Sequence, residues 1–244
     1  MSVFIPSKQI KYTFTVSSAI IQFMKKLKFY KEPAFFIGLI LLSVGMTFVV
    51  KADLGISVVQ SAAYILSLKI KAVSFGTFSY IVQFLLIAIL CAVIRKINIR
   101  YIVSFVSAIL YGYILDLCMY LMRSLPNDAL YLRIIYFAAG FYLIVIAVAL
   151  FFRTNIPLMP YDIFVTDLAR AKNWNINTVK IIYDICCLAA GVALSLIFYK
   201  KLVGIGIGTI ITGLFSGICI KYTGKLMDKI LVFTPIFKKL DKSL

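Results

Sequence analysis

The sequence predicts an all-α, polytopic membrane protein, and its composition and apolar runs carry this prediction. The chain has 244 residues, of which 63% are hydrophobic and 14% are charged, and its mean hydropathy is +1.02. Soluble domains carry about a quarter charged residues, so a soluble or disordered protein is excluded. Six apolar runs have the length of membrane-spanning helices. They lie at about 33–50, 77–94, 101–122, 131–152, 177–198 and 203–222, and two shorter, more polar runs lie at about 57–71 and 160–172.

Basic residues outnumber acidic ones by 26 to 9, which gives the chain a net charge of +17. They lie between the apolar runs and towards both ends, a pattern typical of loops that follow the positive-inside rule. We therefore expect the lipid bilayer, and not nucleic acid, as the partner of this charge. With both termini in the cytoplasm, 19 of the Lys and Arg residues fall on the cytoplasmic side.

Side chains suited to catalysis or metal binding are scarce. The chain has no His, which is the commonest general base and metal ligand. Its five Cys lie inside apolar runs without CxxC spacing, so we interpret them as small buried apolar side chains. The sequence predicts no metal, no cofactor and no enzyme activity.

The two ends of the chain are expected to lie outside the membrane helices. In residues 1–32, four lysines between 25 and 31 follow a moderately apolar stretch, an order that disfavours a cleaved signal peptide. We expect a basic tail or a short interfacial helix there. Residues 223–244 are basic again and are expected to form a cytoplasmic tail.

The middle of the chain divides into two similar halves, residues 33–122 and 131–222. The segment VVKADLGISVVQ (49–60) matches FFRTNIPLMPYD (151–162) in pattern, and a short helix and then a spanning run follow each. We therefore expect two tandem repeats, each of three long transmembrane helices plus one short helix. The aligned residues are Lys51 with Arg153, Asp53 with Asn155, Gly55 with Pro157, Thr77 with Thr178, Gln83 with Asp184, Ser104 with Thr209, and Gly112 with Gly217.

The two short helices are expected to be re-entrant, interfacial or spanning. Ser57 and Gln60 fit a capping box, and Pro160 suits the first position of a helix that carries Asp162 in its first turn. Short helices entered through irregular backbone, at matching places in two repeats, indicate a transporter binding site. If the short helices do not cross the membrane, the halves are inverted, and if both cross, the halves are parallel. The count of Lys and Arg is the same in both cases and leaves the choice open.

Acidic residues inside apolar runs are costly, so each is a candidate site residue. Asp184 lies about two turns into its run and four residues after Lys180, on a polar stripe of an otherwise apolar helix. The pair is a candidate substrate or ion site, or else a structural ion pair near the interface. Asp116 lies near the end of its run and has the same two interpretations.

Further polar candidates precede the short helices, lie in their first turns, or align with Asp184. One interpretation is a polar vestibule in which Arg153 and a helix N-terminus favour an anionic group. The other, for Lys51, Asp53, Arg153 and Asn155, is a set of anchors at the membrane interface. The further candidates are Asp53, Gln60, Gln83, Arg153, Asn155 and Asp162.

Small residues on the last apolar run indicate helix packing. Gly213 and Gly217 form a GxxxG motif, and Gly112 aligns with Gly217 in the first half. The partner helix can belong to the same chain or to a second copy, which leaves a homodimer open.

Four short motifs suggest a family. They are ADLGIS (52–57), SFGTFSYIV (74–82), MPYD (159–162) and GIGIGT (204–209). From about residue 33 to 225 the chain resembles the YczE/YitT-type bacterial integral membrane proteins. The resemblance implies a multi-pass protein of the bacterial inner membrane and supplies no agreed substrate. In that family a Pro–aromatic–Asp turn often follows in the first copy too, whereas here Val58–Val59–Gln60 stands in its place.

Two classes of function follow from these patterns. The leading hypothesis is a small secondary transporter or permease-like protein with a site between the repeats, formed by Asp184 with Asp162 and Arg153, for a small molecule or an ion. The alternative is a non-transporting scaffold or regulatory partner of another membrane protein, for which the GxxxG face and the basic tails are equally suited.

Overall fold

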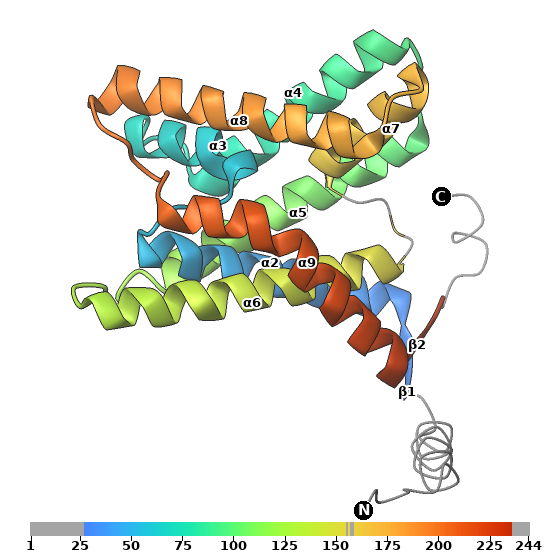
Figure 1. Ribbon diagram of the computed structural model, residues 1–244, viewed down its shortest axis with the longest axis horizontal. Coiled ribbons are helices and arrows are strands. Elements are labelled where there is room, and N and C mark those ends of the chain that lie inside the picture. The colour runs from blue at the N-terminus through green and yellow to red at the C-terminus, as the bar shows by residue number, and fades with distance from the viewer. Residues whose placement is uncertain (1–26, 155, 157–158, 236–244) are drawn as a thin grey trace, which may run out of the picture.

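The computed structural model describes residues 27–154, 156 and 159–235, and these residues form eight helices and two short strands (Figure 1). Six helices are long and apolar enough to cross a membrane, which confirms the six apolar runs. They are α2 (Lys31–Ala52), α4 (Phe75–Ile94), α5 (Ile99–Leu121), α6 (Leu130–Thr154), α8 (Ile176–Tyr199) and α9 (Ile207–Ile230). The two shorter runs form α3 (Val58–Lys69) and α7 (Pro160–Lys172).

Both ends of the membrane region differ from the sequence prediction. Strand β1 (Leu27–Tyr30) precedes α2 and pairs in parallel with β2 (Leu231–Thr234), which follows α9. Helix α9 does not end near residue 222 but continues to Ile230. Its last turns carry lysines at intervals of four, which share one face, and basic residues near a helix C-terminus are favourable. The charge therefore limits the apolar part of the helix without ending the helix.

Local capping explains where several helices begin. Ser74 accepts a hydrogen bond from the N–H of Thr77 at 3.2 Å, and Asn98 and Asn175 cap α5 and α8 in the same way. Ser57 occupies the N-cap position of α3 as expected, but the predicted capping box is wrong because its side chain makes no cap hydrogen bond. The side chain of Gln60 bonds to a neighbouring helix instead.

Contacts between the long helices fix their relative directions. Helices α2 and α6 are antiparallel, because Phe35 packs on Phe151 with ring centroids 5.3 Å apart and Phe48 packs on Tyr136. Lys51 donates to the carbonyl of Arg123 just after α5, so α2 and α5 run in the same direction. We name the side where α2 begins the terminal side, since α9 also ends there beside the end of α6.

Each short helix ends on the side of the bundle where the preceding long helix also ends. Helix α3 runs antiparallel to α4, with Gln60 beside Ser79 and Tyr64 packed on Phe75. It therefore starts about one turn along α4 and returns to the side where α2 ended. Helix α7 runs antiparallel to α8, whose Tyr183 packs on Phe164, and returns to the terminal side.

The eight helices pack as two groups of four (Figure 1). One group holds α3, α4, α7 and α8, and the other holds α2, α5, α6 and α9. Helix α5 joins the groups, because it packs along α4 and also contacts α7. Within the second group α2 and α6 approach most closely, where Gly45 and Gly140 let the two backbones meet.

Candidate functional site

A neutral polar cluster lies at the start of α3. The hydroxyl of Ser79 on α4 donates to Oε1 of Gln60 at 3.0 Å, and Nε2 of Gln83 donates to the Ser79 hydroxyl at 3.2 Å. All three side chains are buried. Oε1 of Gln83 is buried and accepts no hydrogen bond from the described residues. The cluster therefore holds an unused acceptor in an apolar environment, which is costly.

A charged cluster lies at the start of α7. Lys180 on α8 donates to Oδ1 of Asp184 at 2.8 Å, as the sequence spacing allowed. Asp162, in the first turn of α7, interacts electrostatically with both of these residues. Lys180 is ion-paired with Asp184, and the side chains of Lys180 and Asp184 are 43% and 34% exposed. Of the sequence candidates, these three are brought together.

Arg153 and Asp53 form ion pairs that hold helix ends. The guanidinium of Arg153 binds the carboxylate of Asp228 through two bonds of 2.6 and 2.7 Å, which ties the end of α6 to α9. Asp53 pairs with Arg133, whose guanidinium also binds the carbonyls that end α2. Both ion pairs join the end of one helix to a neighbouring helix. Asn155 lies outside the described residues.

Asp116 connects α5 to the start of α4. Its Oδ1 accepts the N–H of Gly76 at 2.8 Å, and its Oδ2 accepts the hydroxyl of Ser74 at 2.5 Å. A carboxylate at a helix N-terminus satisfies free N–H groups and is favoured by the helix dipole. These bonds account for Asp116 without a ligand.

The three candidate packing glycines differ in their surroundings. Gly112 meets the backbone of Gly76, so α4 and α5 approach as closely as the small residues allow. Gly213 and Gly217 have no atom of the described chain within 4 Å of where a Cβ would stand. The partner expected for the GxxxG face is therefore absent from the described part of the chain.

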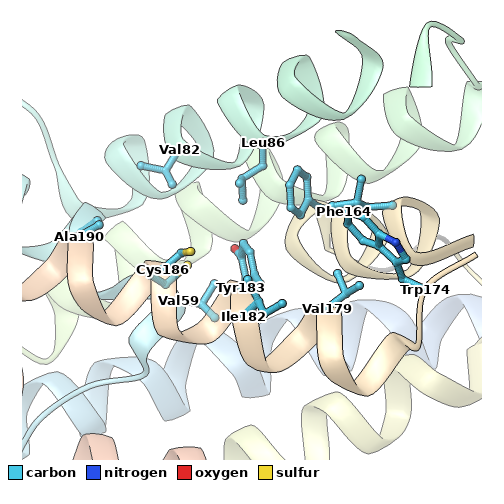
Figure 2. Close-up of a pocket in the computed structure, with 13 residues that line it drawn as sticks. Val59, Val82, Leu86, Phe164, Trp174, Val179, Ile182, Tyr183, Cys186 and Ala190 are labelled. Atoms are coloured by element: carbon cyan, nitrogen blue, oxygen red, sulfur yellow. The ribbon is translucent and has the colours of Figure 1, made fainter. Parts of the chain in front are cut away.

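An apolar pocket of about 440 Å³ lies between helices of the first group (Figure 2). Its walls come from α3, α4, α7 and α8, with Trp174 from the α7–α8 connection, and carry no charged side chain. Tyr183 and Phe164 line this pocket and pack against each other in the core of the group. The pocket is suited to an apolar group, whereas the two clusters described above consist of polar side chains.

Sequence reasoning missed several partners of the candidate residues. Ser79 joins Gln60 to Gln83, and its position in the alignment of the halves corresponds to that of Lys180, which was a usable signal. Asp228 and Arg133 complete ion pairs with residues 75 and 80 positions away in the chain. No local pattern indicates pairs at such separations.

The fold and these clusters define a polytopic helical membrane protein with six candidate spans. The chain belongs to a family of unknown function (DUF6198), whose match covers residues 29–225. A search of curated proteins and a search of solved structures returned no match. The family match does not name the YczE/YitT-type proteins, so that resemblance stays a prediction.

Proposed function

We propose that this protein is a small secondary transporter or permease-like protein, not an enzyme, whose halves are inverted repeats with a polar site at the starts of α3 and α7. The observation that carries the proposal is that the neutral and charged clusters occupy equivalent positions. Adding 102 to Gln60 gives Asp162, and adding 101 to Ser79 and Gln83 gives Lys180 and Asp184.

Helix contacts support the same equivalence. Gly38 contacts Phe151, and Gly140 contacts Val49. Adding 102 to Gly38 gives Gly140, and adding 102 to Val49 gives Phe151, so the two contacts are equivalent. Helix α3 packs on α8 through Ser61 and Gly191. The equivalent helices α7 and α4 also pack together. A two-fold axis in the membrane plane relates contacts in this way.

The short helices are suited to form a site inside the bilayer. A helix of 12 residues, such as α3, is about 18 Å long, roughly half the hydrocarbon thickness. Both short helices are therefore too short to span the bilayer, and α3 begins beside the buried side chains of Ser79 and Gln83. In transporters such half-helix starts bind substrates and coupling ions.

The charged cluster is the better candidate for ligand binding. Gln60, Ser79 and Gln83 are neutral, buried and bonded to one another. Lys180 pairs with Asp184, and Asp162 interacts electrostatically with both, so a polar substrate or a cation can compete for these charged groups. Arg153 is left out of this site because Asp228 binds it.

Orientation follows from the positive-inside rule. Residues 1–32 and 221–244, together with residues 95–100 and 153–180, contain 19 of the 26 Lys and Arg residues. We therefore place both termini in the cytoplasm, and by resemblance we place the protein in a bacterial inner membrane.

A thermal-stability screen of the purified protein tests the site. Metabolites, ions and a pH series are added to wild type, Asp162→Asn and Asp184→Asn, with Asp128→Asn in an exposed loop as the control. A ligand that binds the folded state raises the Tm. We expect a ligand-dependent rise in wild type and the control that both site variants lose. If every ligand changes the Tm of all four proteins by the same amount, the proposed site is contradicted.

A scaffold or regulatory role is the second candidate function. The observation that favours it is the open face at Gly213 and Gly217, which a helix of another membrane protein or a second copy can cover. Gly213→Leu should then abolish co-purification of one stoichiometric partner while leaving the Tm of the isolated chain unchanged.

A further inference from the structure

The two halves pack their last two helices differently. In the first half, α4 lies on α5: Gly76 meets Gly112, and the rings of Phe84 and Phe105 are 5.2 Å apart. In the second half, α8 and α9 make no extensive contact within the described residues. Gly217, the equivalent of Gly112, faces open space.

The equivalent ring positions show the same difference. Phe84 corresponds to Ile185 and Phe105 to Ile210, by the same offsets that align the polar clusters and the glycines. Ile185 and Ile210 are 59% and 62% exposed, so the contact made in the first half is missing in the second.

The gap between α8 and α9 opens towards the terminal side. On the opposite side these helices are joined by residues 200–206, which are fixed to the α2–α3 connection. The N–H of Ile56 donates to the carbonyl of Gly204 at 2.9 Å, and the N–H of Gly208 donates to the carbonyl of Leu54 at 2.8 Å. Separation is therefore greatest where α8 begins and α9 ends.

In the first half, α4 and α5 are held together on the side opposite the terminal side. Asp116 binds Ser74 and the N–H of Gly76, and these bonds fasten the end of α5 to the start of α4. The polar clusters follow the packing of their helices: Ser79 and Gln83 are buried, whereas Lys180 and Asp184 are partly exposed.

We propose that the structure is one of two states of a gate, a mechanism that rests on the proposed transport function. Here the charged cluster is open to the terminal side. In the other state α8 packs against α9 through Gly217, α4 leaves α5, and the neutral cluster opens to the opposite side. The group of α3, α4, α7 and α8 moves as one body.

The packing of the two groups supports such a movement. Contacts of α3 with α8 and of α7 with α4 hold the first group together, and contacts of α2 with α6 hold the second. The interface between α4 and α5 is the main one between the groups, so tilting one group on the other changes this interface most. Rocking of one bundle against another moves access from one side to the other in inverted-repeat transporters.

Two matched pairs of spin labels, placed on a cysteine-free full chain in lipid nanodiscs, test this proposal. The pair Lys71→Cys with Leu121→Cys reports on the α4–α5 side. The pair Lys172→Cys with Leu226→Cys occupies the equivalent positions on the α8–α9 side. Their distances are measured by double electron–electron resonance. We expect a short 71–121 distance with a long 172–226 distance in one population, and the reverse in the other.

Wedge variants supply the control. Gly112→Leu should separate α4 from α5 and shift the 172–226 distribution towards short distances. Gly217→Leu, which meets open space here, should remove the short 172–226 component. Asp116→Ala removes the bonds to α4 without adding bulk. It replaces Gly112→Leu if that variant does not fold, and it should shift the 172–226 distribution in the same direction.

Unchanged distances in all variants would overturn the gate. A stabilising ligand found in the thermal screen would then still support the site, so failure of the gate and failure of the transport proposal are distinguished. A dimer through Gly217 would also overturn the gate, since the 172–226 distance within one chain would stay long.

Discussion

The carboxylate of Asp116 accepts the N–H of Gly76 at 2.8 Å across the interface between α5 and α4. The two residues are 40 positions apart in the chain, and the bond forms at the first turn of α4. It therefore caps one helix from another and joins the end of α5 to the start of α4.

Removing this cap should destabilise the protein. Asp116→Ala leaves the N–H of Gly76 without its acceptor, and loss of a helix cap costs about 1 kcal/mol. We expect a lower Tm in detergent for Asp116→Ala and no change for Asp128→Ala, which lies in an exposed loop. Equal Tm values for the two variants would show that the Asp116 bond contributes nothing to stability.

The neutral cluster should be sensitive to loss of its central hydroxyl. Ser79→Ala leaves the side chains of Gln60 and Gln83 buried without their shared partner, at about 1–3 kcal/mol for each unsatisfied group. Ser67→Ala is the matched control, because the Ser67 hydroxyl bonds only to a carbonyl of its own helix. Thermal unfolding of both variants should show the larger loss for Ser79→Ala, and an equal loss would contradict the buried cluster.

The ion pair of Arg153 and Asp228 should contribute little to stability despite its two bonds. The Asp228 side chain is 58% exposed, so water and salt screen the interaction. A double-mutant cycle with Arg153→Ala and Asp228→Ala should give a coupling free energy below about 1 kcal/mol. A much larger coupling energy would indicate that membrane lipid shields the pair from water.

Close helix packing should separate the glycines into two classes. Gly45→Leu places a side chain against the backbone of Gly140, and overpacking costs about 1–3 kcal/mol. Gly213→Leu meets no atom of the described chain and should leave the Tm of the isolated protein unchanged. A large loss of Tm in Gly213→Leu would mean that another helix covers that face.

Helix type and order were predictable from the sequence because apolar length and local caps decide them. The six long runs and the two short ones all formed helices, and Pro160 begins α7 as its fixed backbone geometry favours. The Lys180–Asp184 pair was predictable for the same local reason, since residues four apart share a helix face.

Contacts between distant segments were not predictable in this way. The bond of Gln60 to Ser79 replaced the expected capping box because a partner on α4 was available, which local sequence does not specify. The strand pairing of residues 27–30 with 231–234 joins segments from opposite ends of the chain, and neither shows a strong strand pattern. The separation of α8 from α9 depends on the tilt between two helix groups and leaves no local signal.

Accessibility of single cysteines tests the central claim, that α3 and α7 each return to the side they entered. Lys71→Cys, Lys96→Cys and Asn173→Cys are made in a cysteine-free chain and treated with a membrane-impermeant maleimide in intact cells. The account predicts that position 71 is labelled from outside, whereas positions 96 and 173 react only after the membrane is opened. Labelling of position 96 from outside, with position 71 protected, would show that both short helices cross the membrane and would contradict the account.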